Sequence, residues 1–155
     1  MNTDMTLKIV TSSSAETERL AGQIGRRLRG GETIELISDL GGGKTTFVRG
    51  LARGFGSKDK VTSPSFTLSN EYKADDKTLF HFDFYRLQEP GIMSDELAEA
   101  VGDPKTVTVV EWADIVQKVL PDNRLTINIK ATDEDLREFT LEYPENLKYL
   151  IPENT

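Results

Sequence analysis

A short run of glycines, one lysine and two threonines has the residue types that bind the phosphates of a nucleotide. The run reads GGGKTT, spans residues 41–46 and follows the apolar stretch 33–37. Glycines let consecutive backbone N–H groups turn toward one anion, and a helix that begins near Lys44 adds the positive end of its dipole. We therefore predict a phosphate-binding loop, in which Lys44 bridges the β- and γ-phosphates of a nucleoside triphosphate and the Thr45 hydroxyl ligates Mg²⁺.

The motif departs from the full pattern at one position. Loops of this kind read G-x-x-x-x-G-K-[ST], and Ser38 stands where the first glycine is expected. If the backbone there needs a positive φ, serine carries a strain of about 1 kcal/mol that glycine avoids. The alternative to a nucleotide loop is a glycine-rich hairpin on a scaffold, but the strand before the run and the helix after it favour the nucleotide loop.

Two acidic residues follow apolar strands in the way that a metal–nucleotide site requires. Asp83 ends the strand around 79–82, and Glu111 ends the strand 107–110. Ligands of open α/β sheets collect beyond the carboxyl ends of the strands, where a carboxylate can hold Mg²⁺ or orient the attacking water. The alternative is that each carboxylate is a helix cap or a solvated side chain. His81, the only histidine, is predicted to be a hydrogen-bonded structural residue.

The elements that position these residues alternate between strands and helices. Ser13 and Glu16 predict a capping box at the start of a helix, and a second helix is predicted to follow the loop and end at Gly54. A third is predicted over about 94–101. Strands are predicted around 7–10, 33–37, 68–72, 78–82, 107–110, 125–129 and 139–143. The predicted fold class is α/β, a P-loop NTPase-like three-layer fold with a mixed, mainly parallel central sheet and an antiparallel edge. The C-terminal Leu147, Leu150 and Ile151 are expected to pack back.

Length, composition and charge limit the kind of protein that this chain can be. The chain has 155 residues, 37% hydrophobic and 29% charged, which fits a single domain spanning 1–155. It has no cysteine, no apolar run long enough for a membrane span and no signal-like N-terminus, so we expect a cytoplasmic protein with no membrane partner. A net charge of −7 disfavours strong direct binding to nucleic acid.

Four motifs in a fixed order resemble the TsaE (YjeE) family, bacterial ATPases of the tRNA threonylcarbamoyladenosine (t6A) pathway. They are DLGGGKTTF at 39–47, TSPSFTL at 62–68, HFDFYRL at 81–87 and VEW at 110–112. The resemblance runs from about residue 13 to residue 130. Besides Ser38, the chain departs from the family at Ser65, where threonine is usual.

The resemblance implies a Mg²⁺-dependent, ATP-binding and ATP-hydrolysing accessory protein. Relatives of this kind hydrolyse ATP slowly alone and act with TsaB and TsaD, which transfer a threonylcarbamoyl group to the adenosine beside the tRNA anticodon. Contact with tRNA would then be indirect, through the complex. The expected cofactors are ATP and Mg²⁺.

The same resemblance assigns roles to residues. Catalytic roles fall to Lys44, Asp83 and Glu111, and Mg²⁺ contacts to Thr45, Glu111 and Asp83. Nucleotide contacts are expected from Ser13, Leu40, Gly41, Gly42, Gly43, Lys44, Thr45, Thr46 and Ser65, with 63–67 as a nucleotide-sensing switch. Ser13 could equally be a plain helix cap. Trp112 could pack, contact a partner or stack on the nucleotide, and Arg86 could stabilise the transferring phosphoryl group or pair with Glu89.

Three other functions stay open as alternatives. A GTPase would be expected to carry an N-K-x-D motif, which the sequence lacks. A small-molecule P-loop kinase usually adds an arginine-rich lid, whereas the stretch 75–99 holds Arg86 as its only arginine. A nucleotide-gated assembly module without significant turnover would follow if Ser38 distorts the loop.

Overall fold

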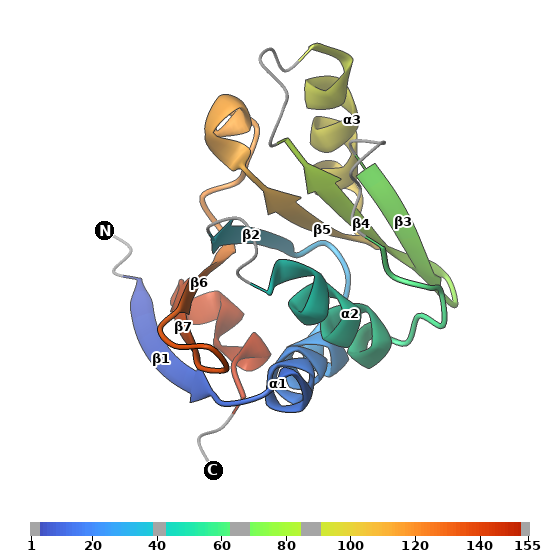
Figure 1. Ribbon diagram of the computed structural model, residues 1–155. Helices are drawn as coiled ribbons and strands as arrows, with labels where there is room; N and C mark the ends of the chain where they lie inside the picture. Colours follow the sequence, from blue (N-terminus) through green and yellow to red (C-terminus); the bar gives the residue numbers. More distant parts are fainter. Residues whose placement is uncertain (1–3, 39–42, 63–68, 85–90, 153–155) are drawn as a thin grey trace.

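A seven-stranded sheet runs through the molecule, with helices on both of its faces (Figure 1). The structure is a computed structural model that describes residues 4–38, 43–62, 69–84 and 91–152. The elements in chain order are β1 (Met5–Thr11), α1 (Ser14–Arg27), β2 (Thr33–Ser38), α2 (Lys44–Phe55), β3 (Ser69–Ala74), β4 (Lys77–Asp83), α3 (Gly91–Gly102), β5 (Thr106–Glu111), η1 (Ala113–Val116), β6 (Leu125–Ala131), β7 (Arg137–Tyr143) and η2 (Glu145–Leu150), where η marks a 3₁₀ helix.

The strand order is β1-β7-β6-β2-β5-β4-β3. The centre, β6-β2-β5-β4, is parallel, whereas β3 pairs antiparallel with β4, and β7 pairs antiparallel with both β6 and β1. All six residues of β5 are buried, as expected for a strand covered on both faces. The predicted mixed α/β sheet with a parallel centre is confirmed, and antiparallel strands lie at both edges.

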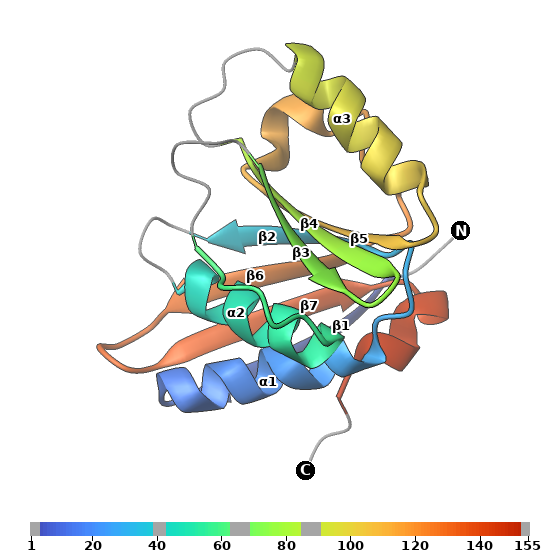
Figure 2. The same cartoon turned by 90° about the vertical axis from the view of Figure 1, so that its right-hand side faces the viewer.

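The helices form one layer on each face of the sheet (Figure 2). The larger core lies against α1, α2 and η2, and includes Ile24, Leu36, Leu51, Phe139 and Leu150. The other core lies under α3 and η1, and includes Phe82, Phe84, Leu97, Val110 and Val116. The three-layer prediction is therefore confirmed. No helix in the described part of the chain combines the length and the apolarity that crossing a membrane demands.

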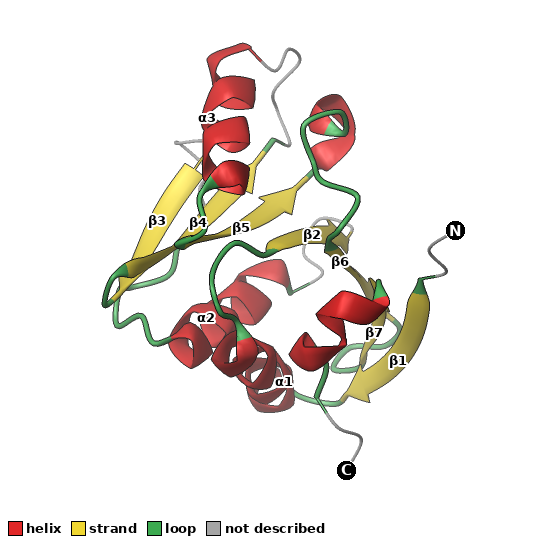
Figure 3. Cartoon of the chain, turned by 180° about the vertical axis from the view of Figure 1, so that it is seen from behind, coloured by secondary structure: helices red, strands yellow, loops and turns green. Residues whose placement is uncertain are grey.

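The C-terminal segment packs back on the α1 face, as predicted (Figure 3). Leu147 and Leu150 of η2 are buried in the larger core. The Tyr149 hydroxyl donates to the Glu32 carboxylate at 2.6 Å, and the Arg29 guanidinium lies 3.9 Å from the centre of the Tyr149 ring. These contacts join the end of the chain to the turn that leads into β2.

The start of α1 is capped by two side chains. The Glu16 backbone N–H donates to Ser13 Oγ at 3.1 Å, as the predicted capping box requires. The Glu16 carboxylate, however, accepts from the Ser12 backbone N–H at 2.8 Å, one residue before the cap. The pKa of Glu16 is lowered mainly by its hydrogen bond with the Ser12 side chain, so the carboxylate that closes the cap stays ionised.

The prediction that α2 ends at Gly54 is wrong. The helix continues to Phe55, and Gly56 ends it with a left-handed backbone at φ 107°. Gly54 faces α1 instead: a Cβ added there would lie 2.2 Å from the Gly22 carbonyl oxygen. This glycine therefore lets the backbones of α1 and α2 approach closely.

Replacing Gly54 with alanine is expected to lower the free energy of unfolding by about 1–3 kcal/mol, because the new methyl group forces two packed backbones apart. Gly102 is a matched control at the end of α3, since a Cβ added there meets no atom within 4 Å. Gly102→Ala should leave stability nearly unchanged. Urea unfolding of the two variants tests the prediction, and equal stabilities would contradict it.

Candidate functional site

The predicted phosphate loop connects β2 to α2 at the carboxyl edge of the parallel strands. β2 ends at Ser38 and α2 begins at Lys44. Gly43 precedes the helix with a left-handed backbone at φ 94°, a conformation that glycine adopts without strain. The N–H groups of the first helical turn have no partner within the helix, so they are available to an anion. Residues 39–42 and 63–68, which include Leu40, Gly41, Gly42 and Ser65, lie outside the described residues, as does Arg86.

The backbone at Ser38 is not strained by a positive φ, the conformation considered above for the first position of the motif. It is the last residue of β2 and pairs with Ile129 of β6. In the described part of the chain, the non-glycine residues with positive φ are Asp75 and Trp112. Serine at this position therefore keeps an ordinary extended backbone, and the missing glycine is no steric obstacle.

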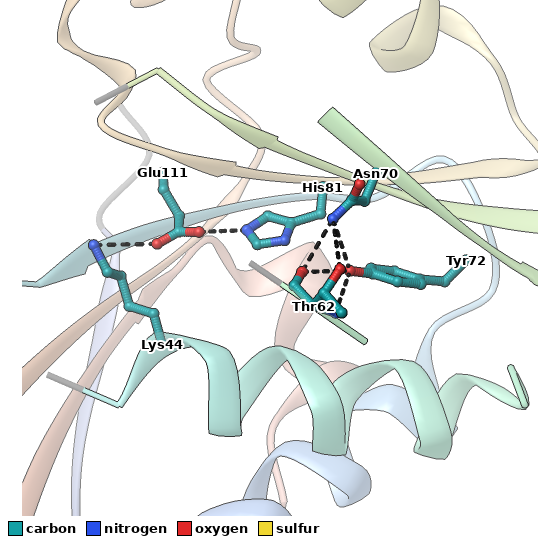
Figure 4. A network of polar contacts seen from close by, with 6 residues as sticks. All are labelled: Lys44, Thr62, Asn70, Tyr72, His81 and Glu111. Atoms are coloured by element: carbon teal, nitrogen blue, oxygen red, sulfur yellow. Dashed lines mark hydrogen bonds and ion pairs between the residues drawn. The ribbon is translucent and has the colours of Figure 1, made fainter. Parts of the chain in front are cut away.

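Lys44, Glu111 and His81 form a chain of polar contacts between the start of α2 and strands β4 and β5 (Figure 4). Lys44 Nζ lies 3.1 Å from Glu111 Oε1, and the other carboxylate oxygen, Oε2, contacts His81 Nε2. The side chains are 12%, 5% and 2% exposed for Lys44, Glu111 and His81. The three residues come from α2, β5 and β4, and the register of the parallel pair β4–β5 brings His81 close to Glu111.

The charge of Glu111 is maintained by its neighbours. Burial by itself would raise the pKa of this carboxyl group, but the hydrogen bond and the charge of His81, together with Lys44, outweigh it and lower the pKa below its ordinary value. Glu111 is therefore a buried, ionised carboxylate. Buried charges of this kind are costly unless paired, and this one is paired on both of its oxygens.

Asp83 ends its strand beside Glu111, as predicted from the sequence. The two residues are direct register partners in the parallel pair β4–β5, and the Phe84 N–H donates to the Glu111 carbonyl oxygen at 3.1 Å. Thr45 and Thr46 lie in the first turn of α2, both half-buried. The structure thus assembles Lys44, Thr45, Asp83 and Glu111 at one edge of the sheet.

These residues offer a set of oxygen donors that suits Mg²⁺. The described residues include no group of three or more histidines, cysteines, aspartates or glutamates arranged to hold a metal by themselves. Mg²⁺, however, is usually held by one or two carboxylates, substrate phosphates and water. Asp83, Glu111 and the Thr45 hydroxyl are compatible with that pattern, because they supply only part of the coordination shell.

Trp112 covers the same corner of the site. Its backbone is left-handed, with φ 56° and ψ 52°, a conformation that costs a bulky residue about 1–2 kcal/mol. The half-buried ring lies 4.9 Å from Lys44 Nζ, measured to the ring centre, within the range of a cation–π contact. Trp112 thus combines a strained backbone with a ring that lies against Lys44.

A second polar group lies next to His81 (Figure 4). The Tyr72 hydroxyl donates to the Thr62 carbonyl oxygen at 2.9 Å, and Asn70 Nδ2 donates to the same oxygen at 3.0 Å. Thr62 directly precedes the segment 63–67, for which the family resemblance implies a switch and which lies outside the described residues. Two side chains of β3 thus bind Thr62, while His81 of β4 contacts Glu111.

Sequence reasoning missed a small cavity between the starts of α1 and α2 and the β6–β7 turn. Its volume is about 80 Å³, and it is lined by Ser13, Ser14, Thr17, Gly43, Thr46, Glu134, Asp135 and Arg137. The last three come from the turn between β6 and β7 and its end, far from the motif in the chain. These three residues belong to no recognisable short motif. Their position near the loop could have been predicted only from the placement of β6 and β7 beside β2 in the sheet.

The sequence is similar to those of known proteins over most of its length. A family model described as "Threonylcarbamoyl adenosine biosynthesis protein TsaE" matches residues 11–139. The chain is 38% identical over 136 residues to the tRNA threonylcarbamoyladenosine biosynthesis protein TsaE of Bacillus subtilis, covering 86% of this chain and 84% of that protein. It is 36% identical over 135 residues to the protein of the same name from Treponema pallidum, covering 87% and 99%.

A solved structure extends the likeness to the fold. The crystal structure of Bacillus subtilis YdiB superimposes with a TM-score of 0.75 at 33% identity, covering 97% of this chain and 94% of that one. The matched region includes the glycine-rich loop, both strand-end carboxylates and Trp112. The chain therefore belongs to the TsaE family, with its role in the biosynthesis of tRNA threonylcarbamoyladenosine.

Proposed function

We propose that this chain is a Mg²⁺-dependent ATPase that acts as an accessory protein of t6A modification together with TsaB and TsaD. The observation that carries the proposal is the contact between Lys44, at the start of α2, and the buried, ionised Glu111 at the end of β5. A lysine at this position of a phosphate loop reaches the outer phosphates of a nucleotide. An acidic residue at the adjacent strand end holds the metal or orients water.

The ion pair supports nucleotide binding because its two partners can separate without leaving a charge unpaired. When a triphosphate lies on the loop, Lys44 Nζ donates to its outer phosphates, and Glu111 keeps its contact with His81. Thr45, Glu111 and Asp83 would hold Mg²⁺, and the ion would neutralise part of the phosphate charge. Glu111 and Asp83 would also be able to orient the attacking water.

The partners carry the contact with tRNA in this proposal. The net charge of −7 repels a phosphate backbone, so a complex in which TsaB and TsaD hold the tRNA fits this chain better than direct binding does. The family assignment supports the same pathway. ATP turnover by this chain would then serve a modification cycle that its partners perform.

The test is ATP turnover measured for the chain alone, with the TsaB–TsaD pair, and with the pair plus tRNA. We expect slow turnover alone and a clear increase with the pair, because slow phosphoryl-transfer sites are commonly completed by a partner. Lys44→Ala in the same assay reports the background. Turnover at that background under all three conditions, with ATP still bound, would refute the ATPase and favour a nucleotide-gated assembly module.

A further inference from the structure

His81 lies between Glu111 and the polar group on β3, and its side chain is 2% exposed (Figure 4). Its Nε2 contacts Glu111 Oε2, and the other carboxylate oxygen, Oε1, lies 3.1 Å from Lys44 Nζ. An ionised carboxylate only accepts hydrogen bonds, so Nε2 carries the hydrogen and His81 is the donor. The two oxygens of Glu111 therefore have different partners, one from the sheet and one from the start of α2.

This contact restricts how the Glu111 carboxylate can turn. The backbones of both residues are held by the parallel pair β4–β5, in which His81 pairs with Val109 and Asp83 pairs with Glu111. A glutamate side chain has several rotamers, and a hydrogen bond from a donor on a fixed strand selects among them. Figure 4 shows Lys44 and His81 on opposite sides of the carboxylate. His81 thus holds Oε2, while Oε1 stays on the side of Lys44.

Packing alone does not explain why residue 81 is a histidine. Its second ring nitrogen, Nδ1, is buried and has no hydrogen-bond partner among the residues that the structure describes. Thr62, Asn70 and Tyr72, on the other side of the ring from Glu111, hydrogen-bond to one another (Figure 4). A buried polar atom without a partner destabilises the fold, and an apolar side chain of similar size would avoid that cost. The role of the histidine therefore lies in its contact with Glu111.

We propose that His81 is a positioning residue that acts through Glu111. Its hydrogen bond to Oε2 directs Oε1 toward the Lys44 side of the site, where the metal and the outer phosphates lie in the proposed function. The proposal rests on that function, because it assumes a triphosphate and Mg²⁺ at this edge of the sheet. His81 itself would touch neither. Loss of a group that orients a metal-binding carboxylate through a hydrogen bond commonly lowers metal affinity or activity by about 10–100-fold.

The test measures by titration calorimetry how much Mg²⁺ increases the affinity for ATP, as the ratio of the affinities in Mg²⁺ and in a chelator. In His81→Leu and His81→Asn we expect this ratio to fall by about tenfold, because leucine has no donor and the asparagine amide is one bond too short to reach Glu111. His81→Gln should keep most of the ratio, since its amide N–H can take the place of Nε2–H. The affinity in the chelator should be the same in all three variants, because Lys44 and the phosphate loop are unaltered.

A second arm separates positioning from a general structural effect. If His81 acts through Glu111, His81→Asn should cause no further fall in the ratio in a Glu111→Gln background. Thr108→Val is the matched control. Thr108 also has a buried polar atom without a partner in the described part of the chain, and it lies on β5, three residues before Glu111. Its replacement should leave the ratio unchanged.

Each outcome supports or overturns the positioning role. A ratio that falls in His81→Asn, is kept in His81→Gln and falls no further in the Glu111→Gln background supports it, whether or not His81→Leu folds. An unchanged ratio in His81→Asn, an equal fall in His81→Gln, or a further fall in the Glu111→Gln background overturns it and leaves the ATPase proposal standing. If Mg²⁺ does not increase the affinity of the unaltered chain for ATP, the metal of the proposed function and the positioning role both fail.

Discussion

Lys44→Ala is expected to abolish ATP binding, weakening the affinity by at least about 100-fold, because charge-assisted contacts to the outer phosphates are lost. The variant also removes one of the two partners of the buried Glu111 carboxylate. The pKa of Glu111 should then rise, since Lys44 is one of the groups that hold it down. Titration calorimetry with ATP and Mg²⁺ measures the loss directly.

Lys58→Ala is the control for this experiment. Lys58 is exposed and lies beyond the end of α2, so its removal takes away one positive charge without touching the loop. Its affinity for ATP should equal that of the unaltered chain. Circular dichroism shows whether Lys44→Ala is folded. A folded Lys44→Ala protein with unchanged nucleotide affinity would count decisively against the phosphate loop.

Local sequence patterns were sufficient to predict most of the sheet. The alternation of Leu125, Ile127 and Ile129 predicted β6, and the continuous apolar run 107–110 predicted a strand buried on both faces. These signals succeed because a strand's side chains alternate between faces and a covered strand cannot expose polar groups. The helix after the glycine run was predictable from local features as well, because its apolar residues recur at helical spacing.

The end of α2 shows where local reasoning fails. A glycine near the end of a helical pattern usually stops the helix, and Gly54 was assigned that part. Its actual role depends on Gly22 of α1, more than thirty residues earlier, because the backbones of the two helices meet there. Gly56 is the residue with the left-handed backbone that ends α2. Nothing within the helix itself distinguishes the two glycines.

The candidate site also contains residues that the sequence predicted and contacts that it did not. Lys44, Asp83 and Glu111 were predicted because each follows a recognisable strand or loop. The contact of His81 with Glu111 was not, since it depends on the register that pairs β4 with β5. Arg137 was missed for a stronger reason. Its place beside Gly43 follows from the order of β7, β6 and β2 in the sheet, which no spacing along the chain encodes.

Glu111→Gln is expected to lower ATP turnover by about 100-fold while ATP still binds, because the variant removes a charge that supports the metal and the attacking water. Folding should suffer much less. Glutamine has nearly the same shape, and its amide oxygen can still accept from His81 Nε2. Lys44 is not fully buried, so it can find solvent. We expect the free energy of unfolding to change by no more than about 1–2 kcal/mol.

Glu32→Gln separates loss of charge from loss of mechanism. Glu32 is also a buried glutamate, 6% exposed, but it precedes β2 at the end of the strand away from the phosphate loop, where it accepts from the Tyr149 hydroxyl at 2.6 Å and from the Gly30 N–H at 2.7 Å. Its replacement should cost comparable stability and leave turnover within about twofold, because distant sites act independently. Steady-state hydrolysis with the TsaB–TsaD pair and urea unfolding of both variants give the comparison. Equal turnover in Glu111→Gln and the unaltered chain would remove Glu111 from the mechanism, whereas equal losses in both glutamine variants would mean that turnover merely follows stability.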